Sequence, residues 1–421
     1  NVVYRENMNV RTVHKRYWKG EHVMAKQSRL RIGVIGVGSI GSAHCKGIGK
    51  MAEAELTAVA DVDRKRAREI GKEYKVPHYG SHQELIAAGK CDLVVVGTPH
   101  PEHEKPALDA IKAGLHVLCE KPVTERVSTA RKVVETAERK GVGFSVNFPV
   151  RTTPASLKAI EIARSGQLGK LQRAVLVLPD YRSQRYYDSA GWRATWKGEG
   201  GGVLLNQAPH FIDLFLQLTG MPERVFGVTE TRLHDIEVED VAEALLRYPG
   251  GGHGYVYTTT NELNLGRMVE VVGSKGALVI RDSATELYRF SDDVEEFTHS
   301  AEDKWAKASA ERVPFRKSRA PQASPLQNLV AHILHGAPLL VDGQSALNSL
   351  ELANAIMLSS DVGDWVSLPI DAKAYDNFLA KKRRGSRKKK RVVEDATGDP
   401  GLKARSAMKD SSKSKKRKRA K

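Results

Sequence analysis

Lys121 and His210 are the two side chains of this sequence whose type and setting best suit proton transfer. Lys121 stands in a Glu-Lys-Pro tripeptide directly after an apolar run, and His210 follows shortly after three consecutive glycines. Removing a hydroxyl proton while hydride leaves the same carbon needs a base with a pKa near the working pH. Histidine meets this requirement directly, and lysine meets it when its surroundings lower its pKa. Such a pair could handle the proton when an alcohol is oxidised, or a carbonyl reduced, by a separate hydride carrier.

Asn206 precedes His210 by four positions, in a stretch (206–218) whose amphipathic pattern predicts a helix. Positions i and i+4 of a helix share one face. We therefore expect Asn206 and His210 to point into one cleft, with the amide oxygen orienting the imidazole. Lys121 would polarise the substrate oxygen or relay the proton. The ordinary alternatives are a solvated lysine at 121 and a structural histidine at 210.

The loop Gly36-Val37-Gly38-Ser39-Ile40-Gly41 is a candidate site for the hydride carrier. This G-x-G-x-x-G follows a predicted strand at once and opens a predicted helix. Gly36 permits the tight turn, Gly38 lets the backbone approach a pyrophosphate, and Gly41 allows close helix–strand packing. The helix begins at Ser39 and Ile40, and its N-terminus turns a partial positive charge toward the phosphates. The alternative is that the glycines serve only a turn.

Asp61 ends the second predicted strand and is the residue expected to read the adenosine ribose. A carboxylate at this place accepts hydrogen bonds from the ribose hydroxyls and repels a 2′-phosphate. The sequence thus favours NAD over NADP. Arg64 lies one turn further on and would partly offset that repulsion, which keeps NADP as the alternative. In the structural alternative, Asp61 only caps a helix.

The first half of the chain has the pattern of an α/β fold: an N-terminal Rossmann domain over residues 31–150. Continuous β-branched runs alternate with helical stretches, which predicts a doubly wound parallel sheet with helices on both faces. The expected strands are 31–36, 55–61, 92–98, 116–119 and 143–148, and a helix is expected over 127–140.

The pattern changes after residue 150 to longer alternating strands with tight turns, which predicts a C-terminal α/β domain with a large, mostly antiparallel open sheet. Strands are expected at 171–178, 224–231, 241–248, 254–260, 268–272 and 277–281, and helices at 155–164, 206–218, 326–335 and 346–362. Residues 151–380 are assigned to this second domain. The helices at 346–362 are expected to pack back on the Rossmann domain.

The net charge of +17 belongs to the two ends of the chain. Residues 1–30 carry +5 and residues 381–421 carry +15, which leaves about −3 for the body between them. The segment 381–421 is almost free of apolar residues and is predicted to be a disordered basic tail. It would bind polyanions without specificity, or simply be solvated. Residues 1–30 are expected to be a disordered extension, with Met24 as a candidate start.

The remaining bulk features favour a soluble cytoplasmic protein. The three cysteines (Cys45, Cys91 and Cys119) lack the spacing of a disulfide framework or a zinc site, so no metal is expected. Neither a long apolar span nor a secretory h-region is present in the sequence, which predicts no membrane partner.

Three motifs together resemble the glucose–fructose oxidoreductase / inositol dehydrogenase / rhizopine catabolism (Gfo/Idh/MocA) family. They are Thr98-Pro99-His100-Pro101-Glu102-His103, Glu120-Lys121-Pro122, and the stretch 200–213 (GGGVLLNQAPHFID). The resemblance runs from about residue 31 to 379, and the Glu-Lys-Pro tripeptide is its most specific part. It implies NAD(P)-dependent oxidation or reduction of a hydroxyl or carbonyl carbon on a sugar, sugar derivative or cyclitol. It also implies that residues 151–380 bind the substrate and that their open sheet pairs the chain into a homodimer or homotetramer.

The resemblance further assigns roles to particular residues. Lys121 is similar to the lysine that contacts the nicotinamide ribose and the substrate, and His210 to the catalytic histidine. Inositol-dehydrogenase-like members carry an aspartate where this chain has Asn206, which puts myo-inositol in doubt as the substrate. The cofactor would also meet a set of residues at the ends of two strands: Thr98, Pro99, His103 and Glu120. For His103 the alternative is a helix cap.

Trp192 and Arg193 form the candidate substrate loop ahead of the three glycines. An aromatic face and a guanidinium fork suit a sugar ring and its hydroxyls. Upstream, Tyr181, Arg182, Arg185, Tyr186 and Tyr187 form a polar–aromatic cluster that could reach a substrate carboxylate or phosphate. Two other functions stay open beside the dehydrogenase: a cofactor-binding regulator without chemistry, and a redox-neutral glycosidase that uses bound NAD transiently.

Overall fold

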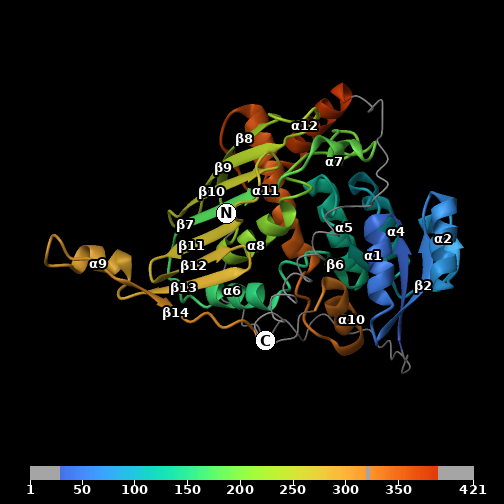
Figure 1. Ribbon diagram of the computed structural model, residues 1–421, viewed down its shortest axis with the longest axis horizontal. Helices are drawn as coiled ribbons and strands as arrows, with labels where there is room; N and C mark the ends of the chain where they lie inside the picture. The colour runs from blue at the N-terminus through green and yellow to red at the C-terminus, as the bar shows by residue number, and fades with distance from the viewer. Residues whose placement is uncertain (1–28, 319–322, 387–421) are drawn as a thin grey trace, which may run out of the picture.

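The computed structural model describes residues 29–318 and 323–386 (Figure 1). The predictions for residues 1–28, including the candidate start at Met24, and for residues 387–421 lie outside the described residues. Two sheets, each with its own helices, lie side by side in the described part, with helix α11 (Gly343–Val362) between them (Figure 1).

The N-terminal sheet is parallel and six-stranded, in the order β3-β2-β1-β4-β5-β6. Its strands are β1 (Leu30–Ile35), β2 (Ala54–Ala60), β3 (His78–Tyr79), β4 (Leu93–Val96), β5 (His116–Cys119) and β6 (Phe144–Val146). Its helices are α1 (Ser39–Ile48), α2 (Arg64–Tyr74), α3 (His82–Ala87), α4 (Glu104–Lys112) and α5 (Val127–Lys140). The strand order reverses between β1 and β4, so the crevice for a ligand opens at their carboxyl ends. The predicted Rossmann domain is confirmed.

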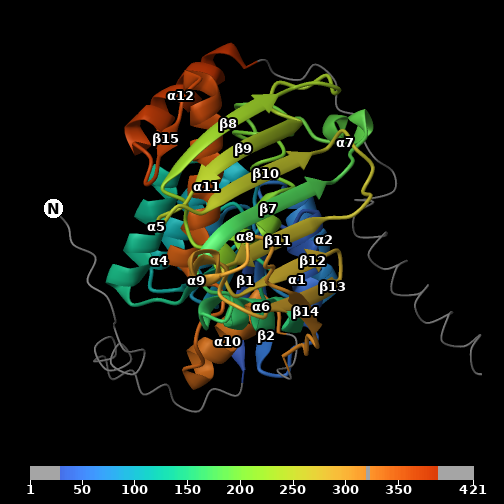
Figure 2. The same ribbon diagram turned by 90° about the vertical axis from the view of Figure 1, so that its left-hand side faces the viewer.

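The second sheet has nine strands in the order β14-β13-β12-β11-β7-β10-β9-β8-β15. They are β7 (Leu171–Pro179), β8 (Arg224–Glu230), β9 (Val241–Arg247), β10 (His253–Thr259), β11 (Met268–Gly273), β12 (Gly276–Arg281), β13 (Ala284–Phe290), β14 (Ala310–Val313) and β15 (Val366–Ser367). Strands β7 and β10 pair in parallel, and the other neighbours pair antiparallel. Figure 2 shows one face of this sheet toward the viewer, with the helices behind it. The mostly antiparallel sheet is confirmed.

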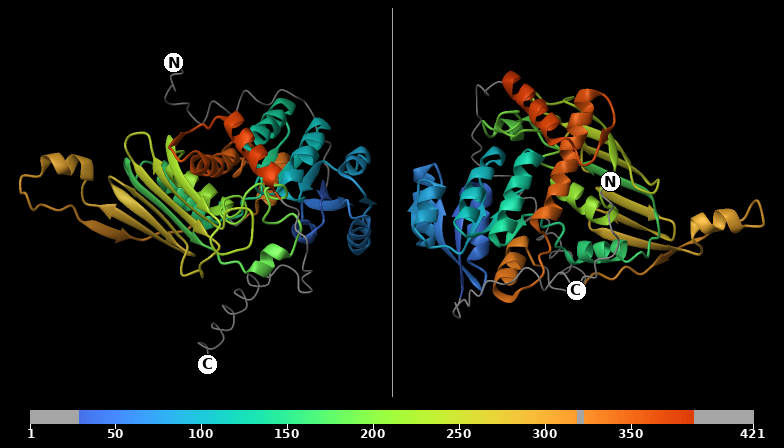
Figure 3. Two further views of the ribbon diagram at one scale, coloured as in Figure 1. Left: turned by 90° about the horizontal axis from the view of Figure 1, so that it is seen from above. Right: turned by 180° about the vertical axis from the view of Figure 1, so that it is seen from behind.

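The remaining helices lie against the second sheet, against the Rossmann domain or between the two. They are α6 (Pro154–Arg164), α7 (Gln184–Asp188), α8 (Pro209–Thr219), α9 (Val294–Ser300), α10 (Pro325–His335), α11 and α12 (Ala372–Gly385). Helix α8 contacts β7 and β11 of the second sheet, whereas α10 contacts β5 and β6 of the Rossmann sheet. Helix α11 contacts α5 and β6 on one side and β8 and α8 on the other. The view from behind shows α11 and α12 beside α5 (Figure 3). These contacts place α11 between the second sheet and helix α5.

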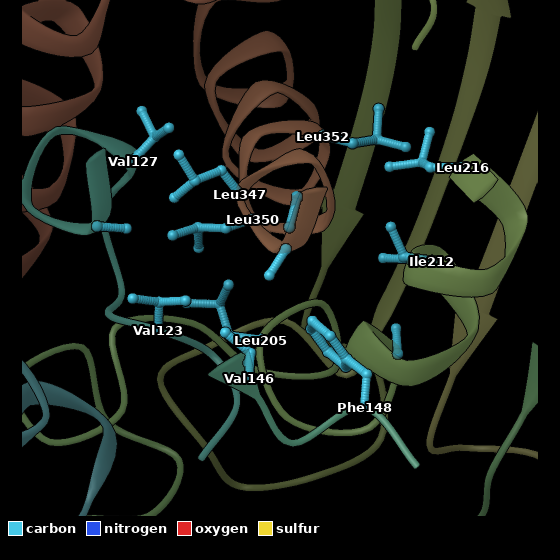
Figure 4. Close-up of a cluster of buried hydrophobic side chains, with 14 of the residues drawn as sticks. Val123, Val127, Val146, Phe148, Leu205, Ile212, Leu216, Leu347, Leu350 and Leu352 are labelled. Atoms are coloured by element: carbon cyan, nitrogen blue, oxygen red, sulfur yellow. The ribbon is translucent and has the colours of Figure 1, made fainter. Parts of the chain in front are cut away.

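Apolar side chains from both domains meet around α11 (Figure 4). Leu347 and Leu350 of α11 lie near Val123 and Val127, while Leu352 lies near Leu216 of α8. Hydrogen bonds also join α11 to the Rossmann domain. The side chain of Asn354 accepts from the backbone N–H of Val127 (3.0 Å) and donates to the carbonyl of Glu125 (3.3 Å). The two domains therefore share one continuous core, which fixes their relative position at the cleft.

Two predicted boundaries were wrong. The helix expected at 206–218 begins at Pro209, because proline suits the first position of a helix and Asn206 lies in the turns that precede it. The basic tail expected from residue 381 does not include residues 381–385, because α12 continues to Gly385. Arg383 of this run is partly buried and donates to the carboxylate of Glu125 at 2.8 Å, while Lys381 and Arg384 are exposed. Among the described residues no helix is long and apolar enough to cross a membrane.

Candidate active site at the domain junction

The glycine-rich loop lies at the carboxyl end of β1, where α1 begins. Gly36 has φ +83°, a conformation that favours glycine. A Cβ on Gly41 would lie 1.9 Å from the carbonyl oxygen of Gly36, so only glycine allows this approach. A Cβ on Gly38 would meet no atom within 4 Å. The bare backbone at Gly38 thus faces open space at a helix N-terminus, which is the setting a pyrophosphate needs.

Ser39 and Ile40, the first two residues of α1, are both exposed. The exposed fraction of Ile40 is 42%, although it is a large apolar residue beside the loop. A dinucleotide lying on the loop would cover this surface. The residues present therefore fit the cofactor.

Asp61 follows β2, as predicted, and its carboxylate is bound to backbone on both sides. It accepts from the N–H of Val37 (2.9 Å) and from the N–H of Asp63 (2.9 Å). The first of these bonds ties Asp61 to the glycine-rich loop. Asp63, rather than Asp61, caps α2. Arg64 donates to Glu84 at 3.1 Å, so its guanidinium is engaged on the surface.

His103 connects the loop after β4 to the loop after β5. It is fully buried, and its ring nitrogens lie 2.7 Å from the carbonyl oxygens of Thr98 and Pro122. It therefore neither caps α4 through its side chain nor has a nitrogen left for the cofactor. Pro99 and Thr98 are half-buried beside it, and the Thr98 hydroxyl donates to the carbonyl of Glu102 (2.9 Å). His103 thus positions two loops of the site.

Glu120 is buried at the end of β5 and links three segments. Its Oε1 lies 2.7 Å from Nε2 of His44 on α1 and accepts from the side chain of Asn147 (2.6 Å). Burial acts to raise the pKa of Glu120, but the hydrogen bond and charge of His44 and the amide of Asn147 outweigh it and lower the pKa. A charged Glu120 in this position fixes the backbone from which Lys121 extends.

The ammonium group of Lys121 points to the turn that precedes α8. Its Nζ donates to the backbone oxygen of Asn206 at 2.7 Å and lies 3.4 Å from the side-chain oxygen of the same residue. Burial lowers the pKa of Lys121, while the carboxylates of Glu120 and Glu199 act in the opposite direction and the guanidinium of Arg193 adds to the lowering. Lys121 therefore releases its proton at a lower pH than a free lysine does.

The carboxamide of Asn206 binds away from His210. Its Nδ2 donates to Glu199 and to the hydroxyl of Tyr186 (3.1 Å). The expectation that it orients the imidazole was wrong, because Asn206 precedes the helix and its amide is taken by Lys121, Glu199 and Tyr186. It instead connects Lys121 to a buried carboxylate.

Glu199 is the main site residue that the sequence analysis missed. Only 1% of it is exposed, and its second carboxylate oxygen accepts from the N–H of Ala194 at 2.6 Å. Burial raises the pKa of Glu199, against the opposing effects of Arg193 and of the donors Ala194 and Asn206. Its only sequence signal is its place just before the three glycines, where a glutamate in a polar loop is ordinarily solvated.

A second buried carboxylate, that of Glu239, holds the glycine turn. It accepts from the N–H groups of Gly202 (2.8 Å) and Leu204 (3.1 Å). A Cβ on Gly202 would lie 1.9 Å from the carbonyl oxygen of Glu239, which explains a glycine there. Burial raises the pKa of Glu239 to about 7. Glu239 therefore shapes the turn that presents Asn206.

His210 lies in the first turn of α8, half-buried against Phe148. The two rings meet edge to face with 5.8 Å between centroids. Phe148 follows the last Rossmann strand, so His210 stands at the junction of the domains. Asp213, one turn later, is fully committed to a buried ion pair with Arg151. That pair anchors α8 to the segment after β6.

Trp192 and Arg193 lie over Tyr186 and His100 at the other side of the site. The guanidinium of Arg193 is 4.2 Å from the ring centroid of Tyr186 and 4.8 Å from that of Trp192. The ring of His100 lies 5.7 Å from that of Trp192. His100 is buried, its pKa is lowered mainly by burial, and its Nδ1 has no hydrogen-bond partner in the described part of the chain. Such a nitrogen suits a ligand that enters the cleft.

No group of three His, Cys, Asp or Glu side chains among residues 29–318 and 323–386 could hold a metal ion. The site consists of Lys121, buried carboxylates, histidines, and an arginine whose guanidinium stacks on aromatic rings. A cofactor beside Gly38 and a hydroxyl-bearing substrate beside Lys121 would meet at the carboxyl ends of β4 and β5.

Comparison with known families supports both domains. Residues 30–148 match the family model described as "Oxidoreductase family, NAD-binding Rossmann fold", and residues 156–279 match the "GFO/IDH/MocA C-terminal domain". Together these matches cover more than half of the chain. The chain belongs to the Gfo/Idh/MocA family. The N-terminal domain is therefore an NAD-binding Rossmann domain, and the chain is an oxidoreductase.

Relatives within the Gfo/Idh/MocA family include the trans-1,2-dihydrobenzene-1,2-diol dehydrogenases of mammals. The bovine enzyme (Bos taurus) is 31% identical over 266 residues, which span 61% of this chain and 77% of the relative. The human enzyme (Homo sapiens) is 29% identical over 252 residues, spanning 59% and 73%.

Solved structures of the Gfo/Idh/MocA fold align over most of the chain. The WlbA dehydrogenase of Bordetella pertussis, in complex with NADH and UDP-GlcNAcA, is 26% identical with a TM-score of 0.69, covering 82% of this chain and all (100%) of that one. A levoglucosan dehydrogenase in complex with NADH, 20% identical with a TM-score of 0.69, covers 81% of this chain and 100% of its own, and shows the shared fold.

Proposed function

We propose that this protein is an NAD-dependent dehydrogenase or reductase that acts on a CH–OH or carbonyl carbon of a sugar or sugar derivative. Lys121 and His210 handle the proton. The observation that carries the proposal is the Lys121 ammonium, whose pKa is lowered by burial and which is held at 2.7 Å by an uncharged acceptor, the backbone oxygen of Asn206. A lysine with a lowered pKa exchanges its proton at a lower pH than a free lysine does, which suits general acid–base catalysis.

Bound NAD supplies the hydride acceptor, and NADH the donor. The chain supplies the rest. The ammonium of Lys121 binds the substrate oxygen and withdraws charge from it, and in the oxidative direction its neutral form takes up the hydroxyl proton. His210, at the start of α8, is the second base at the cleft and passes the proton toward solvent. Glu120, charged and fixed by His44 and Asn147, keeps Lys121 in place.

The relatives support a hydroxylated ring as substrate. The mammalian relatives are named for a cyclic trans-diol, and the WlbA structure contains a nucleotide sugar. Each presents a secondary alcohol on a six-membered ring. Asn206 in place of an acidic residue disfavours myo-inositol, because an amide cannot share the proton as a carboxylate does. NADP remains the alternative cofactor through Arg64. The homodimer or homotetramer and the cytoplasmic location stay predictions.

The experiment is a screen for NADH absorbance with purified protein, NAD or NADP, and a panel of sugars, glycosides, sugar acids, nucleotide sugars and inositols. Lys121→Ala and His210→Ala should each lower turnover by about 10²–10⁴-fold and leave NADH affinity unchanged. Lys112→Ala, at an exposed lysine of α4, is the matched control and should keep full turnover.

Three outcomes contradict the proposal in different ways. Full turnover in Lys121→Ala would remove the catalytic assignment. Substrate cleavage without net NADH would indicate the redox-neutral glycosidase. Cofactor binding with no turnover on any compound would favour the regulator.

A further inference from the structure

Arg193 is held firmly by two aromatic rings, while its charge has no close carboxylate partner. The guanidinium stacks on Tyr186 and Trp192, and Nη1 donates to the Tyr186 hydroxyl. Its buried Nε donates to no acceptor within the described ranges. Among residues 29–318 and 323–386, no carboxylate oxygen lies within 4.0 Å of this guanidinium. A guanidinium has five N–H donors, so most of its binding capacity is left for another molecule.

A second cation, Lys121, lies two side chains away from Arg193. The Tyr186 hydroxyl binds both Arg193 and the side chain of Asn206, and Asn206 in turn binds the Lys121 ammonium. The charge of Arg193 is among the influences that lower the pKa of Lys121, as is that of Arg182. Because only Tyr186 and Asn206 link the two groups, we place one substrate molecule against both.

The acidic groups nearest to these cations are already engaged. Glu199 is buried and uses its oxygens on the N–H of Ala194 and on Asn206. Asp180 forms ion pairs with Arg182 (3.0 Å) and with Arg267 (2.9 Å). Arg182 is thus in a direct ion pair, whereas Glu199 acts on Arg193 and Lys121 only from beyond contact distance. The cleft therefore presents two cations that have no directly bound carboxylate within the described residues.

We propose that the substrate is a sugar that carries a carboxylate, and that Arg193 binds this carboxylate. This inference rests on the proposed dehydrogenase function and adds the charge of its substrate. The planar, weakly hydrated guanidinium matches a carboxylate with two parallel hydrogen bonds, and its stacking on Tyr186 and Trp192 fixes the direction of the fork. With the acid group held at Arg193, the hydroxyl to be oxidised is placed at Lys121.

A phosphate ester would offer Arg193 a similar pair of oxygens. Its second negative charge, however, calls for a second unpaired cation beside the guanidinium, and Arg182 is already paired with Asp180. The single negative charge of a carboxylate neutralises the single positive charge of Arg193. The positive charge of Lys121 then remains available to bind the reacting oxygen. The chemistry of the cleft therefore favours the monoanion.

The test measures binding to the protein–NADH complex, read from NADH fluorescence, so it needs no turnover. The ligands are matched pairs: D-glucuronate and D-glucose, D-galacturonate and D-galactose, UDP-glucuronate and UDP-glucose, with D-glucose 6-phosphate as the phosphate arm. In at least one pair the acid should bind at least about tenfold more tightly than its neutral partner. Arg193→Met should remove this preference without changing NADH affinity, and Arg193→Lys should keep part of it.

Arg232→Met is the matched control, because Arg232 is an exposed arginine of the same domain, and it should keep the preference. Equal affinity for acids and neutral sugars, or a preference that survives Arg193→Met, would overturn the inference. Tighter binding of D-glucose 6-phosphate than of any uronate would assign a phosphate ester instead and overturn the carboxylate. Oxidation of neutral sugars alone would leave the dehydrogenase standing and remove only this inference, whereas neither turnover nor binding with any compound would remove both.

Discussion

The Lys121 ammonium and the Glu199 carboxylate are joined through a single residue, Asn206, which accepts from the lysine and donates to the glutamate. The lysine is thus held by neutral oxygens, and the Glu199 carboxylate lies one side chain further away. At that separation the carboxylate raises the pKa of Lys121 only in part, and burial lowers it. Glu199 therefore raises the pKa of Lys121 without contacting its ammonium group.

Glu199→Gln should move the deprotonation of Lys121 to lower pH. The amide keeps the shape of the side chain but removes one of the two negative charges that favour the ammonium, those of Glu120 and Glu199, while the opposing charges of Arg193 and Arg182 remain. The sign follows directly: less negative charge means a lower lysine pKa. The rising limb of the pH profile for alcohol oxidation should shift to lower pH by a measurable fraction of a unit.

The shift can also be measured without a substrate, from the pH dependence of Lys121 labelling by an amine-reactive reagent, read by mass spectrometry. Glu270→Gln is the control, because Glu270 pairs with Arg173 on the second sheet, and should leave the profile in place. Identical profiles for Glu199→Gln and the unaltered protein would show that Glu199 serves only to support the loop.

Glu239→Gln should stabilise the protein more at about pH 8 than at about pH 5. Burial raises the pKa of Glu239 from 4.5 to about 7, so the folded state binds this proton more tightly than the unfolded state. Its contribution to stability is present below the unfolded pKa and is lost as the pH rises through about 7. Each unit of pKa shift corresponds to about 1.4 kcal/mol. Urea unfolding at the two pH values measures the difference.

Glutamine at 239 keeps an oxygen for the N–H groups of Gly202 and Leu204 and does not titrate. Glu230→Gln, at an exposed glutamate of the same domain, is the control and should show no such pH dependence. A constant difference in unfolding free energy between Glu239→Gln and the unaltered protein at both pH values would mean that Glu239 does not titrate in this range.

Asp61→Ala should weaken NAD binding about tenfold and relax the preference for NAD over NADP. The carboxylate does two things: it accepts from the N–H of Val37 in the glycine-rich loop, and it repels a 2′-phosphate. Affinities for both cofactors, measured by fluorescence titration, give the ratio. Asp63→Ala is the matched control, since Asp63 caps α2, and should lower stability but keep the ratio. An unchanged ratio in Asp61→Ala would show that Asp61 does not read the ribose.

The sequence predicted the features that neighbouring residues determine. Backbone conformation requires the glycines of the loop, and hydrophobic runs mark the parallel strands and the position of Lys121 after β5. Glu199 could not be predicted in the same way, because its burial depends on how the loop from Tyr186 to Asn206 folds and on Lys121, which comes from the Rossmann domain. The end of α12 was missed for a similar reason. A run rich in lysine and arginine resembles a solvated tail until Glu125 is known to lie beside it.

A chain that ends at Ser386 should keep its activity, whereas one that ends at Leu379 should lose stability and turnover. The last residues of α12 bind the substrate loop. Arg383 donates to the carbonyl of Trp196 (3.3 Å), and Ser386 is bound by the N–H of Lys197 (3.2 Å). Without these contacts, the loop that carries Arg193 loses hydrogen bonds that hold it in place. Thermal unfolding and turnover of the two chains provide the comparison, and equal behaviour would show that the end of α12 is dispensable.

Gly38→Ala and Gly41→Ala should separate cofactor binding from folding within one loop. A Cβ at Gly38 meets no protein atom within 4 Å, and this residue has an ordinary φ of −66°, so alanine costs the fold little. That same methyl group would occupy the approach of the pyrophosphate, and NADH affinity should fall at least about tenfold.

A Cβ at Gly41 would lie 1.9 Å from the oxygen of Gly36, so Gly41→Ala should lower the melting temperature clearly, by several degrees or more. Fluorescence titration and thermal unfolding on both variants decide the matter. If Gly38→Ala bound NADH normally, the cofactor would have to cross the sheet edge somewhere other than at this loop.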